Sequence, residues 1–313
     1  MVLAVVALVL GAALLTVGAE AFAENVTGAA ARLGVSVLAL AVLLAGAEPE
    51  EAITTMVAAG QAHPALAAGD ALGANLVILT LSIGLAALVC PLPVTRRVLE
   101  YAGAAVAVGA LAVVLLWNGV LSRGEGLLLV VVYAAGVGWV WYRERTPPVI
   151  GEMAEVDLDE PPVVQDSGRP LLLVLLGLLG MVAGGLLAVR GAEGLVTALH
   201  ADESVIGLTV LALATSAEMV ALVWAARRRG LTEVVVAGAV GAVAYNATVS
   251  LGLAGVVNPL VLGQRSPAAL VGIATAVLPL VLFAGYRSGT FPRWLGAPLL
   301  LCYGGALWWL FAR

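Results

Sequence analysis

Apolar residues occupy most of the chain in runs of about twenty, separated by short polar stretches. About 20 apolar residues in helical conformation cross the roughly 30 Å hydrocarbon core of a bilayer. About ten such runs occur, and each predicts a transmembrane helix. They are residues 2–23, 34–60, 64–90, 98–117, 124–142, 170–190, 203–226, 232–257, 268–286 and 293–311. The expected fold class is an all-α polytopic membrane protein.

One long polar stretch divides this pattern into two halves. It reads RERTPPVIGEMAEVDLDEPPVVQDSGR at 143–169 and is acidic and rich in proline. Such a composition is typical of a water-exposed linker. We therefore expect a first five-helix repeat at 1–142, a linker at 143–169 and a second five-helix repeat at 170–313.

The two halves resemble each other when one is compared with the other at a single constant offset in residue number. The matched positions are Ser36-Val37 with Ser204-Val205, Glu50 with Glu218, and Gly73 with Gly241. Because five is an odd number of helices, the second copy must enter the membrane from the opposite side. Inverted-topology repeats of this kind are common in secondary transporters, which bind their substrates near the midplane between the repeats.

The second apolar run is interrupted by the acidic sequence GAEPEEA, which holds Glu48, Pro49, Glu50 and Glu51. A carboxylate deep in a bilayer costs several kcal/mol, roughly, unless it faces a polar cavity, a cation or a proton. Proline suits the first turn of a new helix, so the break predicts a half-helix that starts near Pro49. The dipole of that half-helix would favour acids in its first turn. The acids therefore indicate a cation site.

The matching segment of the second half, LALATSAEMVAL, again offers only oxygen ligands. Two downstream stretches, AGDALGAN and AYNATVS, add further carboxylate and amide oxygens. The candidate ligands are Glu48, Glu50, Glu51, Asp70, Asn75, Thr215, Ser216, Glu218 and Asn246. Such a set suits Ca²⁺, Na⁺ or a proton and is wrong for zinc or copper. Small residues would let the neighbouring helices approach the broken ones closely, and these are Gly69, Gly73, Gly238 and Gly241.

Other roles stay open for some of these polar residues. Glu48 also suits a vestibule or gate, and Asp70 also suits a hydrogen bond to a helix end. Glu193 lies in a Gly-Ala-Glu context that suits a water-filled entrance. His63 and His200 fall in short connections, where we expect them to be solvated.

Composition supports the membrane assignment, since 62% of the 313 residues are hydrophobic and only 11% are charged. All fifteen basic residues are arginine, and most of them fall in alternate connections. The positive-inside rule then predicts that both termini lie outside a prokaryotic cell membrane and that the 143–169 linker is cytoplasmic. No set of nucleophile, base and acid and no nucleotide-binding loop indicates an enzyme, and nothing indicates a cofactor or a nucleic-acid partner. The expected partners are lipid and inorganic cations.

Several motifs together resemble the calcium/cation antiporter superfamily, which includes sodium/calcium and cation/proton exchangers. AGAEPEEA and ATSAEMVA are similar to the family's glutamate helix, Gly-Thr-Ser-Leu-Pro-Glu. GDALGAN at 69–75 and AGAVGAV at 237–243 are similar to Gly-Asn-x-x-Gly-Ser-Asn. NGVLSRGEG at 118–126 looks like the hallmark Asp-Gly-x-x-Ser-Arg-x-Glu-Gly. The resemblance implies two α-repeats, at 33–90 and 202–258.

The chain departs from the family pattern within the expected ion site. The family glutamate stands at a fixed spacing before the second glycine of the next motif. Glu51 has that spacing to Gly73, but Met219 holds the equivalent place before Gly241. The resemblance therefore implies a cation exchanger with an altered site.

The expected activity is exchange of Ca²⁺ for Na⁺ or H⁺. A monovalent Na⁺/H⁺ exchanger and a non-transporting membrane scaffold remain as alternatives. The sequence leaves stoichiometry, regulation and oligomeric state open.

Overall fold

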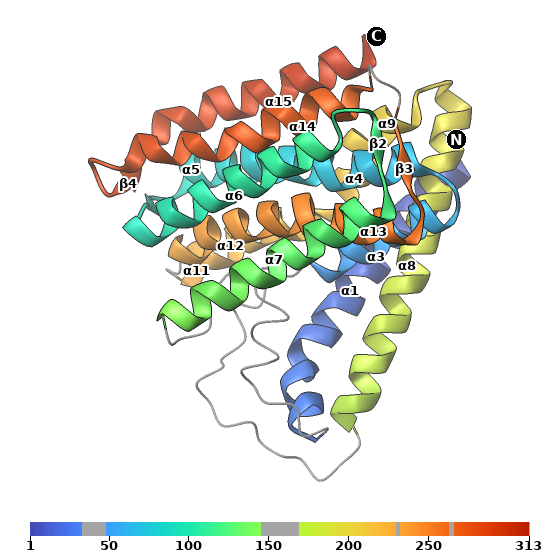
Figure 1. The fold of residues 1–313 in the computed structure, drawn as a ribbon, viewed down its shortest axis with the longest axis horizontal. Helices are drawn as coiled ribbons and strands as arrows, with labels where there is room; N and C mark the ends of the chain where they lie inside the picture. Colours follow the sequence, from blue (N-terminus) through green and yellow to red (C-terminus); the bar gives the residue numbers. More distant parts are fainter. Residues whose placement is uncertain (33–47, 145–168, 230–231, 263–265, 313) are drawn as a thin grey trace.

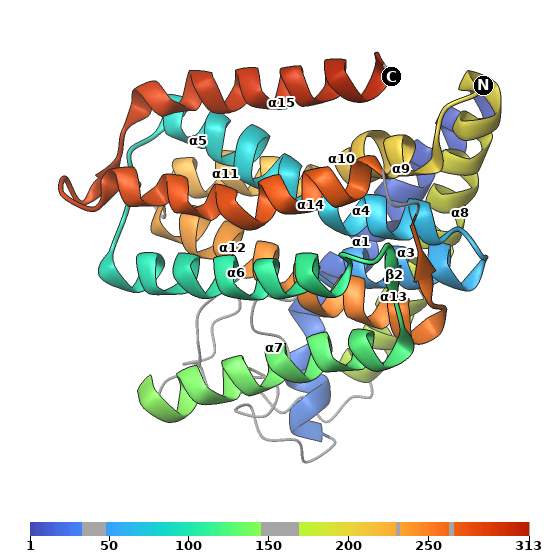
Figure 2. The ribbon, with the colours of Figure 1, turned by 45° about the horizontal axis from the view of Figure 1, so that its top comes forward.

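The computed structural model describes residues 1–32, 48–144, 169–229, 232–262 and 266–312 (Figure 1). Part of the expected second helix, at 33–47, and most of the expected linker, at 145–168, lie outside the described residues. Within them the chain is almost wholly helical, as predicted. The helices run mostly along one direction, with short connections at the two ends (Figures 1 and 2).

The first half contains helices, one π-helical segment and two short strands. They are α1 Val2–Arg32, α3 Pro49–Gly60, α4 Pro64–Leu76, η1 Val77–Ser82, α5 Ile83–Val89, β1 Leu92–Pro93, α6 Arg96–Leu115, β2 Val120–Leu121 and α7 Arg123–Glu144. The second half repeats this order. Its elements are α8 Arg169–Leu199, α9 Glu203–Ile206, η3 Gly207–Leu211, α10 Ala212–Thr215, α11 Ala217–Arg229, α12 Thr232–Tyr245, η4 Asn246–Ser250, α13 Leu251–Val257, β3 Leu260–Val261, α14 Pro267–Val277, η5 Leu278–Gly285, β4 Thr290–Phe291, η6 Arg293–Leu295 and α15 Gly296–Phe311.

Eight helical segments of the described chain are long and apolar enough to span a membrane, and Glu203–Thr215 is a shorter apolar one. This confirms a polytopic helical membrane fold. Helices α1 and α8 are longer than the sequence predicted, since they end at Arg32 and Leu199. A helix need not stop where hydrocarbon ends, because its backbone hydrogen bonds are internal. Polarity marks the membrane boundary, and it does not by itself end a helix.

Three π-helical turns of the described chain, η1, η3 and η4, interrupt the central helices. Each contains a threonine whose hydroxyl donates to the carbonyl four residues back: Thr80 to Leu76 at 2.5 Å, Thr209 to Val205 at 2.6 Å and Thr248 to Ala244 at 2.5 Å. Thr80 and Thr248 occupy equivalent positions in the two halves, at the same offset as Glu50 and Glu218. Since π turns are rare and are frequent at functional sites, their recurrence at matched positions indicates that these helices contribute to a functional site.

The two halves are tied together by two small antiparallel sheets. β1 pairs with β4, and β2 pairs with β3, so each sheet takes one strand from each half. β1 and β3 also occupy equivalent positions in the two halves, which makes the two pairings equivalent. An exchange of equivalent partners is expected when two oppositely inserted repeats are related by a two-fold axis in the membrane plane. The pairing accords with the inverted repeats predicted from the sequence.

Helices α1 and α8 pack against each other through glycines and run obliquely to the other helices (Figure 1). A methyl group on Gly11 would lie 2.7 Å from the carbonyl oxygen of Gly184, and one on Gly18 would lie 2.7 Å from that of Gly177. Such contacts allow only glycine, because the two backbones touch. Helices α1 and α8 therefore form one tightly packed pair, which we call the α1–α8 unit.

Both chain termini lie at the same end of the molecule (Figures 1 and 2). The start of α6, the end of α7 and β4 lie at the opposite end, and these elements carry or border Arg96, Arg143 and Arg293. These three arginines, which contributed to the predicted topology, thus lie at the end of the molecule opposite the chain termini.

Candidate functional site

Two helices break at matched positions in the middle of the fold. Helix α3 starts at Pro49, with Glu48 in a non-helical conformation (φ −114°, ψ 78°) before it. Helix α11 starts at Ala217, the position equivalent to Pro49, after Ser216 has interrupted the helix at φ −85° and ψ 10°. The start of a half-helix at Pro49 agrees with the sequence prediction. The break in the second repeat occurs without a proline.

The first turns of both half-helices carry acids. Glu50 and Glu51 lie in the first turn of α3, and Glu218 lies in the first turn of α11. The unpaired N–H groups at the start of a helix favour negative charge there. Both half-helices thus direct the positive ends of their dipoles at one region, and the carboxylates share that region.

Three carboxylates from the two repeats converge. Glu48, Glu50 and Glu218 each place one carboxylate oxygen so that the three atoms lie within 4.8 Å of one another. Glu48 is fully buried and Glu50 is 1% exposed. Neither oxygen of Glu50 has a hydrogen-bond partner among the described residues. Like charges this close are stable only when a cation or protons neutralise them. We call these residues the carboxylate triad.

Glu51 and Asp70 form a second acidic group beside the triad. Ser216 donates a hydrogen bond to Glu51 at 2.7 Å, and the Thr215 hydroxyl lies 3.2 Å from an oxygen of Asp70. Both acids are fully buried. The second oxygen of each has no hydrogen-bond partner in the part of the chain that the structure describes. The hydroxyl pair predicted as ligands therefore contacts this group, and we call Glu51 and Asp70 the acid pair.

A polar track continues from the acids along α3. Thr55, one turn after Glu51, donates to the carbonyl of Ser250 at 3.1 Å. The Ser250 hydroxyl in turn donates to the side-chain oxygen of Asn246 at 3.0 Å. All of these side chains are buried. This track links Asn246 to α3, although no hydrogen bond among the described residues joins Asn246 to a carboxylate, so its role as a ligand stays a prediction.

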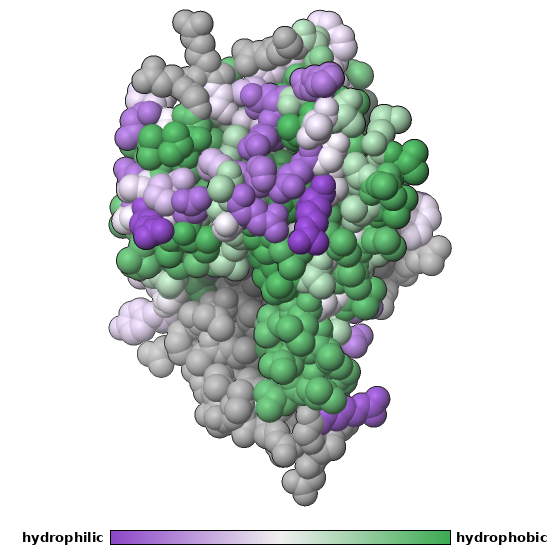
Figure 3. All heavy atoms as spheres, turned by 90° about the vertical axis from the view of Figure 1, so that its right-hand side faces the viewer, coloured by the Kyte–Doolittle hydropathy of each residue, from purple (hydrophilic) through white to green (hydrophobic). Residues whose placement is uncertain are grey.

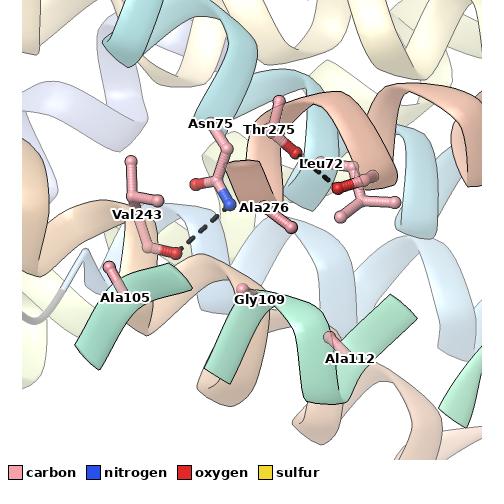
Figure 4. Close-up of a pocket in the computed structure, with 10 residues that line it drawn as sticks. Leu72, Asn75, Ala105, Gly109, Ala112, Val243, Thr275 and Ala276 are labelled. Atoms are coloured by element: carbon pink, nitrogen blue, oxygen red, sulfur yellow. Dashed lines mark hydrogen bonds between the residues drawn. The ribbon is translucent and has the colours of Figure 1, made fainter. Parts of the chain in front are cut away.

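Asn75 forms a hydrogen bond between the two repeats. Its amide nitrogen donates to the carbonyl of Val243, 168 residues away, at 3.2 Å, so equivalent positions of the two repeats touch (Figure 4). Asn75 also lines a cavity of about 10 Å³ between α4, α6, α12 and α14 (Figure 4). That volume is at the lower limit for one water molecule. Its role as an ion ligand also stays a prediction.

Glycines bring α4 against the broken helix of the second repeat, as expected. A methyl group on Gly73 would lie 2.6 Å from the carbonyl oxygen of Leu208, and one on Gly69 would lie 2.9 Å from that of Ser204. This approach brings Asp70 to Thr215. The matching approach of Gly238 and Gly241 would involve residues 34–47, which lie outside the described residues.

Two tyrosines border the triad, and the sequence reasoning did not identify them. The rings of Tyr133 and Tyr245 meet edge to face with centroids 5.5 Å apart. Both tyrosines interact electrostatically with Glu48, and Tyr245 also interacts with Glu50. Tyr245 directly precedes Asn246 in the quoted AYNATVS stretch, so its position next to a candidate ligand was the available signal.

The hallmark-like NGVLSRGEG stretch has a structural explanation outside the site. Ser122 and Glu125 form a reciprocal cap at the start of α7: the backbone N–H of Ser122 donates to the Glu125 carboxylate at 2.8 Å, and the Glu125 N–H donates to the Ser122 hydroxyl at 3.4 Å. Gly119 adopts φ +80°, which glycine accommodates without strain. The motif therefore fixes the turn between α6 and α7.

Two oppositely inserted repeats, matched helix breaks and a buried acidic centre define a class of membrane protein. They are the features of a helical secondary transporter for cations.

Comparison with known proteins identifies the family. The family model described as "Sodium/calcium exchanger protein" matches residues 3–142 and 169–312, so the chain belongs to this family of cation antiporters, which are not enzymes. Inner membrane protein YrbG of Escherichia coli K12 is 28% identical over 99% of this chain and 96% of its own length. Putative antiporter CaxA of Alkalimonas amylolytica is 25% identical over the whole of both chains. The solved sodium-calcium exchanger NCX_Mj has the same fold, with a TM-score of 0.63, 23% identity and 98% coverage of both chains.

Proposed function

We propose that the protein exchanges Ca²⁺ for Na⁺ or H⁺ across the membrane by alternating access, with the carboxylate triad as the principal Ca²⁺ site. The observation that carries this proposal is the convergence of Glu48, Glu50 and Glu218, two from one repeat and one from the other, within 4.8 Å. Two of these carboxylates lie at the start of α3, and α8 packs on α3 at Gly185. An ion bound to them can therefore couple its own binding to a movement of the α1–α8 unit against the central helices.

The chemistry of the triad favours a large divalent ion. Since the three oxygens lie within 4.8 Å of one another, an ion at their centre lies at most about 2.8 Å from each oxygen. Ca²⁺ binds oxygen at about 2.3–2.6 Å with flexible geometry, which this limit accommodates. Mg²⁺ requires near-octahedral geometry and gives up its water reluctantly, which suits a buried set of three carboxylates less well. The ligand set therefore supports Ca²⁺ over Mg²⁺.

The acid pair offers a place for the counter-ion. Glu51 and Asp70 are buried, and the hydroxyls of Ser216 and Thr215 complete an environment of oxygen atoms. Among the described residues no arginine forms an ion pair with Glu50 or with either acid of the pair. The combined negative charge therefore requires cations or protons when Ca²⁺ leaves. Competition for this charge is the physical basis proposed for exchange.

The remaining proposals concern topology. The linker at 143–169 is proposed to be cytoplasmic and the termini external, because most arginines belong to one end of the helices. The division into repeats at 1–142 and 170–313 follows the matched helix breaks. Access to the site is proposed to alternate through movement of the α1–α8 unit against the central helices, since that unit is held together mainly by its own glycine contacts.

The test is ⁴⁵Ca²⁺ uptake into proteoliposomes driven first by a sodium gradient and then by a pH gradient. Exchange predicts uptake with at least one gradient and its loss in the Glu50→Gln variant. Glu100→Gln is the matched control, because Glu100 lies outside the site in an ion pair with Arg96. Sodium–proton exchange without Ca²⁺ movement would instead identify a monovalent exchanger. No flux with any ion would identify a scaffold.

A further inference from the structure

A cluster of one histidine and two glutamates lies at the end of the molecule that carries the chain termini, apart from the carboxylate triad. The Nε2 atom of His63 lies 2.8 Å from a carboxylate oxygen of Glu193, and its Nδ1 atom lies 2.9 Å from one of Glu203. The three side chains are 27%, 34% and 33% exposed. Hydrophilic side chains gather over this end face (Figure 3). The cluster is therefore open to protons from water, unlike the buried triad.

The two contacts define the protonation state of His63. A neutral imidazole has one N–H donor and one acceptor, whereas the imidazolium has two donors. Ionised carboxylates only accept hydrogen bonds. Both contacts are satisfied together only when each ring nitrogen carries a proton. Because the glutamates contact opposite sides of the ring, their oxygens do not converge on one point as the triad oxygens do, and the geometry suits a proton better than a metal ion.

The cluster joins three parts of the fold that lead to the site. His63 lies in the connection between α3, which carries Glu50 and Glu51, and α4, which carries Asp70. Glu193 lies near the end of α8, which belongs to the α1–α8 unit. Glu203 lies in the first turn of α9, which leads to the break at Ser216. The His63–Glu193 contact therefore links α8 to the α3–α4 connection.

The local backbone indicates that His63 is held in place. Ala62, directly before it, adopts φ +66°, a left-handed conformation that is unfavourable for a residue other than glycine. The N–H of His63 donates to the carbonyl of Ala58 at 3.0 Å and fixes the turn. The turn thereby directs the imidazole at the two acids, whose contacts offset the strain.

The other charged groups near this end are accounted for. They are Arg123 and Glu125 at the start of α7, Arg190 and His200 on and after α8, Asp202 before α9, Asp70 on α4, and the amino group of Met1 at the start of α1. Arg123 donates to the carbonyl of Val257 at 3.4 Å, and Glu125 accepts from the N–H of Ser122. Asp202 accepts a hydrogen bond from the N–H of Ser204 at 2.7 Å and caps α9. Asp70 belongs to the acid pair, and neither β3 nor α14 carries a charged residue. Among the described residues, only His63 joins two acids in this way.

We propose that His63, Glu193 and Glu203 form a proton-binding site separate from the transport site, and that its proton locks α8 onto the α3–α4 connection. With both ring nitrogens protonated, the imidazolium bridges both acids and the lock is closed. When one proton leaves, one contact becomes a repulsion between a lone pair and a carboxylate, and the lock opens. The consequence for flux rests on the proposed function, whereas the consequence for structure does not.

Hydrogen–deuterium exchange on the full-length protein tests the lock directly. We compare native protein with His63→Gln at about pH 5.5 and about pH 8, on either side of the usual histidine range. The expected result is that His63→Gln speeds exchange of the 59–63 amides about threefold to fivefold at the lower pH and leaves it unchanged at the higher pH. Each comparison is made at one pH, so the intrinsic effect of pH on exchange cancels.

Two further variants separate this lock from a general loss of structure. Glu193→Gln keeps the histidine and removes one charged acceptor, so it should reproduce the effect in part. His200→Gln replaces the other histidine of the chain, at the same end, and should have no effect. Equal exchange in native protein and His63→Gln at the lower pH, or an equal effect of His200→Gln, would overturn the proposal.

Flux measurements then show whether the lock regulates transport. With acid on the side of this cluster, native protein should carry cations more slowly than His63→Gln, and the two should become equal near pH 8, roughly. If no variant moves any cation, the proposed function fails while the exchange data still decide the lock. If flux is normal and exchange is independent of His63, the lock alone fails.

Discussion

Replacement of Glu218 by glutamine should change the preference of the site between ions of different charge. Glutamine keeps the shape and one carbonyl oxygen but removes one unit of negative charge. Two unit charges 4 Å apart interact by about 4 kcal/mol at an effective dielectric constant of about 20. A divalent ion in the triad would therefore lose up to about 8 kcal/mol of attraction, and a monovalent ion up to about 4 kcal/mol. The amide oxygen recovers part of both amounts.

Affinity should thus fall unequally for the two kinds of ion. We expect at least a 100-fold weaker affinity for Ca²⁺, roughly 2.7 kcal/mol, and about half that free energy for Na⁺. The assay is equilibrium ⁴⁵Ca²⁺ binding to purified protein, with Na⁺ affinity taken from competition. Glu100→Gln serves as the control, because Glu100 is 46% exposed and pairs with Arg96 on the surface of α6. Unchanged Ca²⁺ affinity, or equal losses for Ca²⁺ and Na⁺, would refute the assignment of Glu218 to the triad.

Three more predictions follow from particular contacts. Gly73→Val should lower stability by about 1–3 kcal/mol, because the new side chain meets the carbonyl of Leu208, whereas Gly103→Val has open space and serves as the control in thermal unfolding. Ser122→Ala should cost about 1 kcal/mol through the lost cap with Glu125 and leave Ca²⁺ affinity unchanged; a large change in affinity would contradict the structural role of that motif. Ca²⁺ at 100 times its Kd should stabilise the protein by about 2.7 kcal/mol, chelation should reverse this, and equal stabilisation by Mg²⁺ would contradict the preference for Ca²⁺ proposed for the triad.

The sequence predicted the features that depend on a single segment or on the match between the two halves. Pro49 and the acids around it violate the apolar pattern so strongly that a half-helix beginning there was the simplest interpretation, and α3 begins at Pro49. The constant offset between the two halves placed Glu218 opposite Glu50, and both belong to the triad. These inferences needed only local chemistry and a comparison of the chain with itself.

The arrangement of the acids could not be predicted in the same way. Glu48, which also suited a vestibule, joins the triad, whereas Glu51, which has the family spacing, binds Ser216 instead. Which acid faces which partner depends on how α3 is rotated about its axis relative to α11. Packing between distant segments sets that rotation, and the apolar pattern of neither helix encodes it alone.

Partners far apart in the sequence were missed for the same reason. His63 was expected to be solvated, yet it contacts Glu193 and Glu203, 140 residues away in the second case. Tyr133 meets Tyr245 through a contact that no sequence spacing reveals. Such contacts arise from the opposite insertion of the two repeats, which brings together segments far apart in the chain. The hydrophobic pattern within one segment holds no information about its distant neighbours.

The most direct measurement of the central claim is anomalous diffraction from crystals of the protein soaked in Sr²⁺, a heavier ion with the chemistry of Ca²⁺. The account predicts an anomalous peak between the carboxylates of Glu50 and Glu218, within about 3 Å of an oxygen of each. A peak elsewhere in the membrane region, with these two carboxylates turned away from each other, would contradict the claim that acids from the two repeats share one cation.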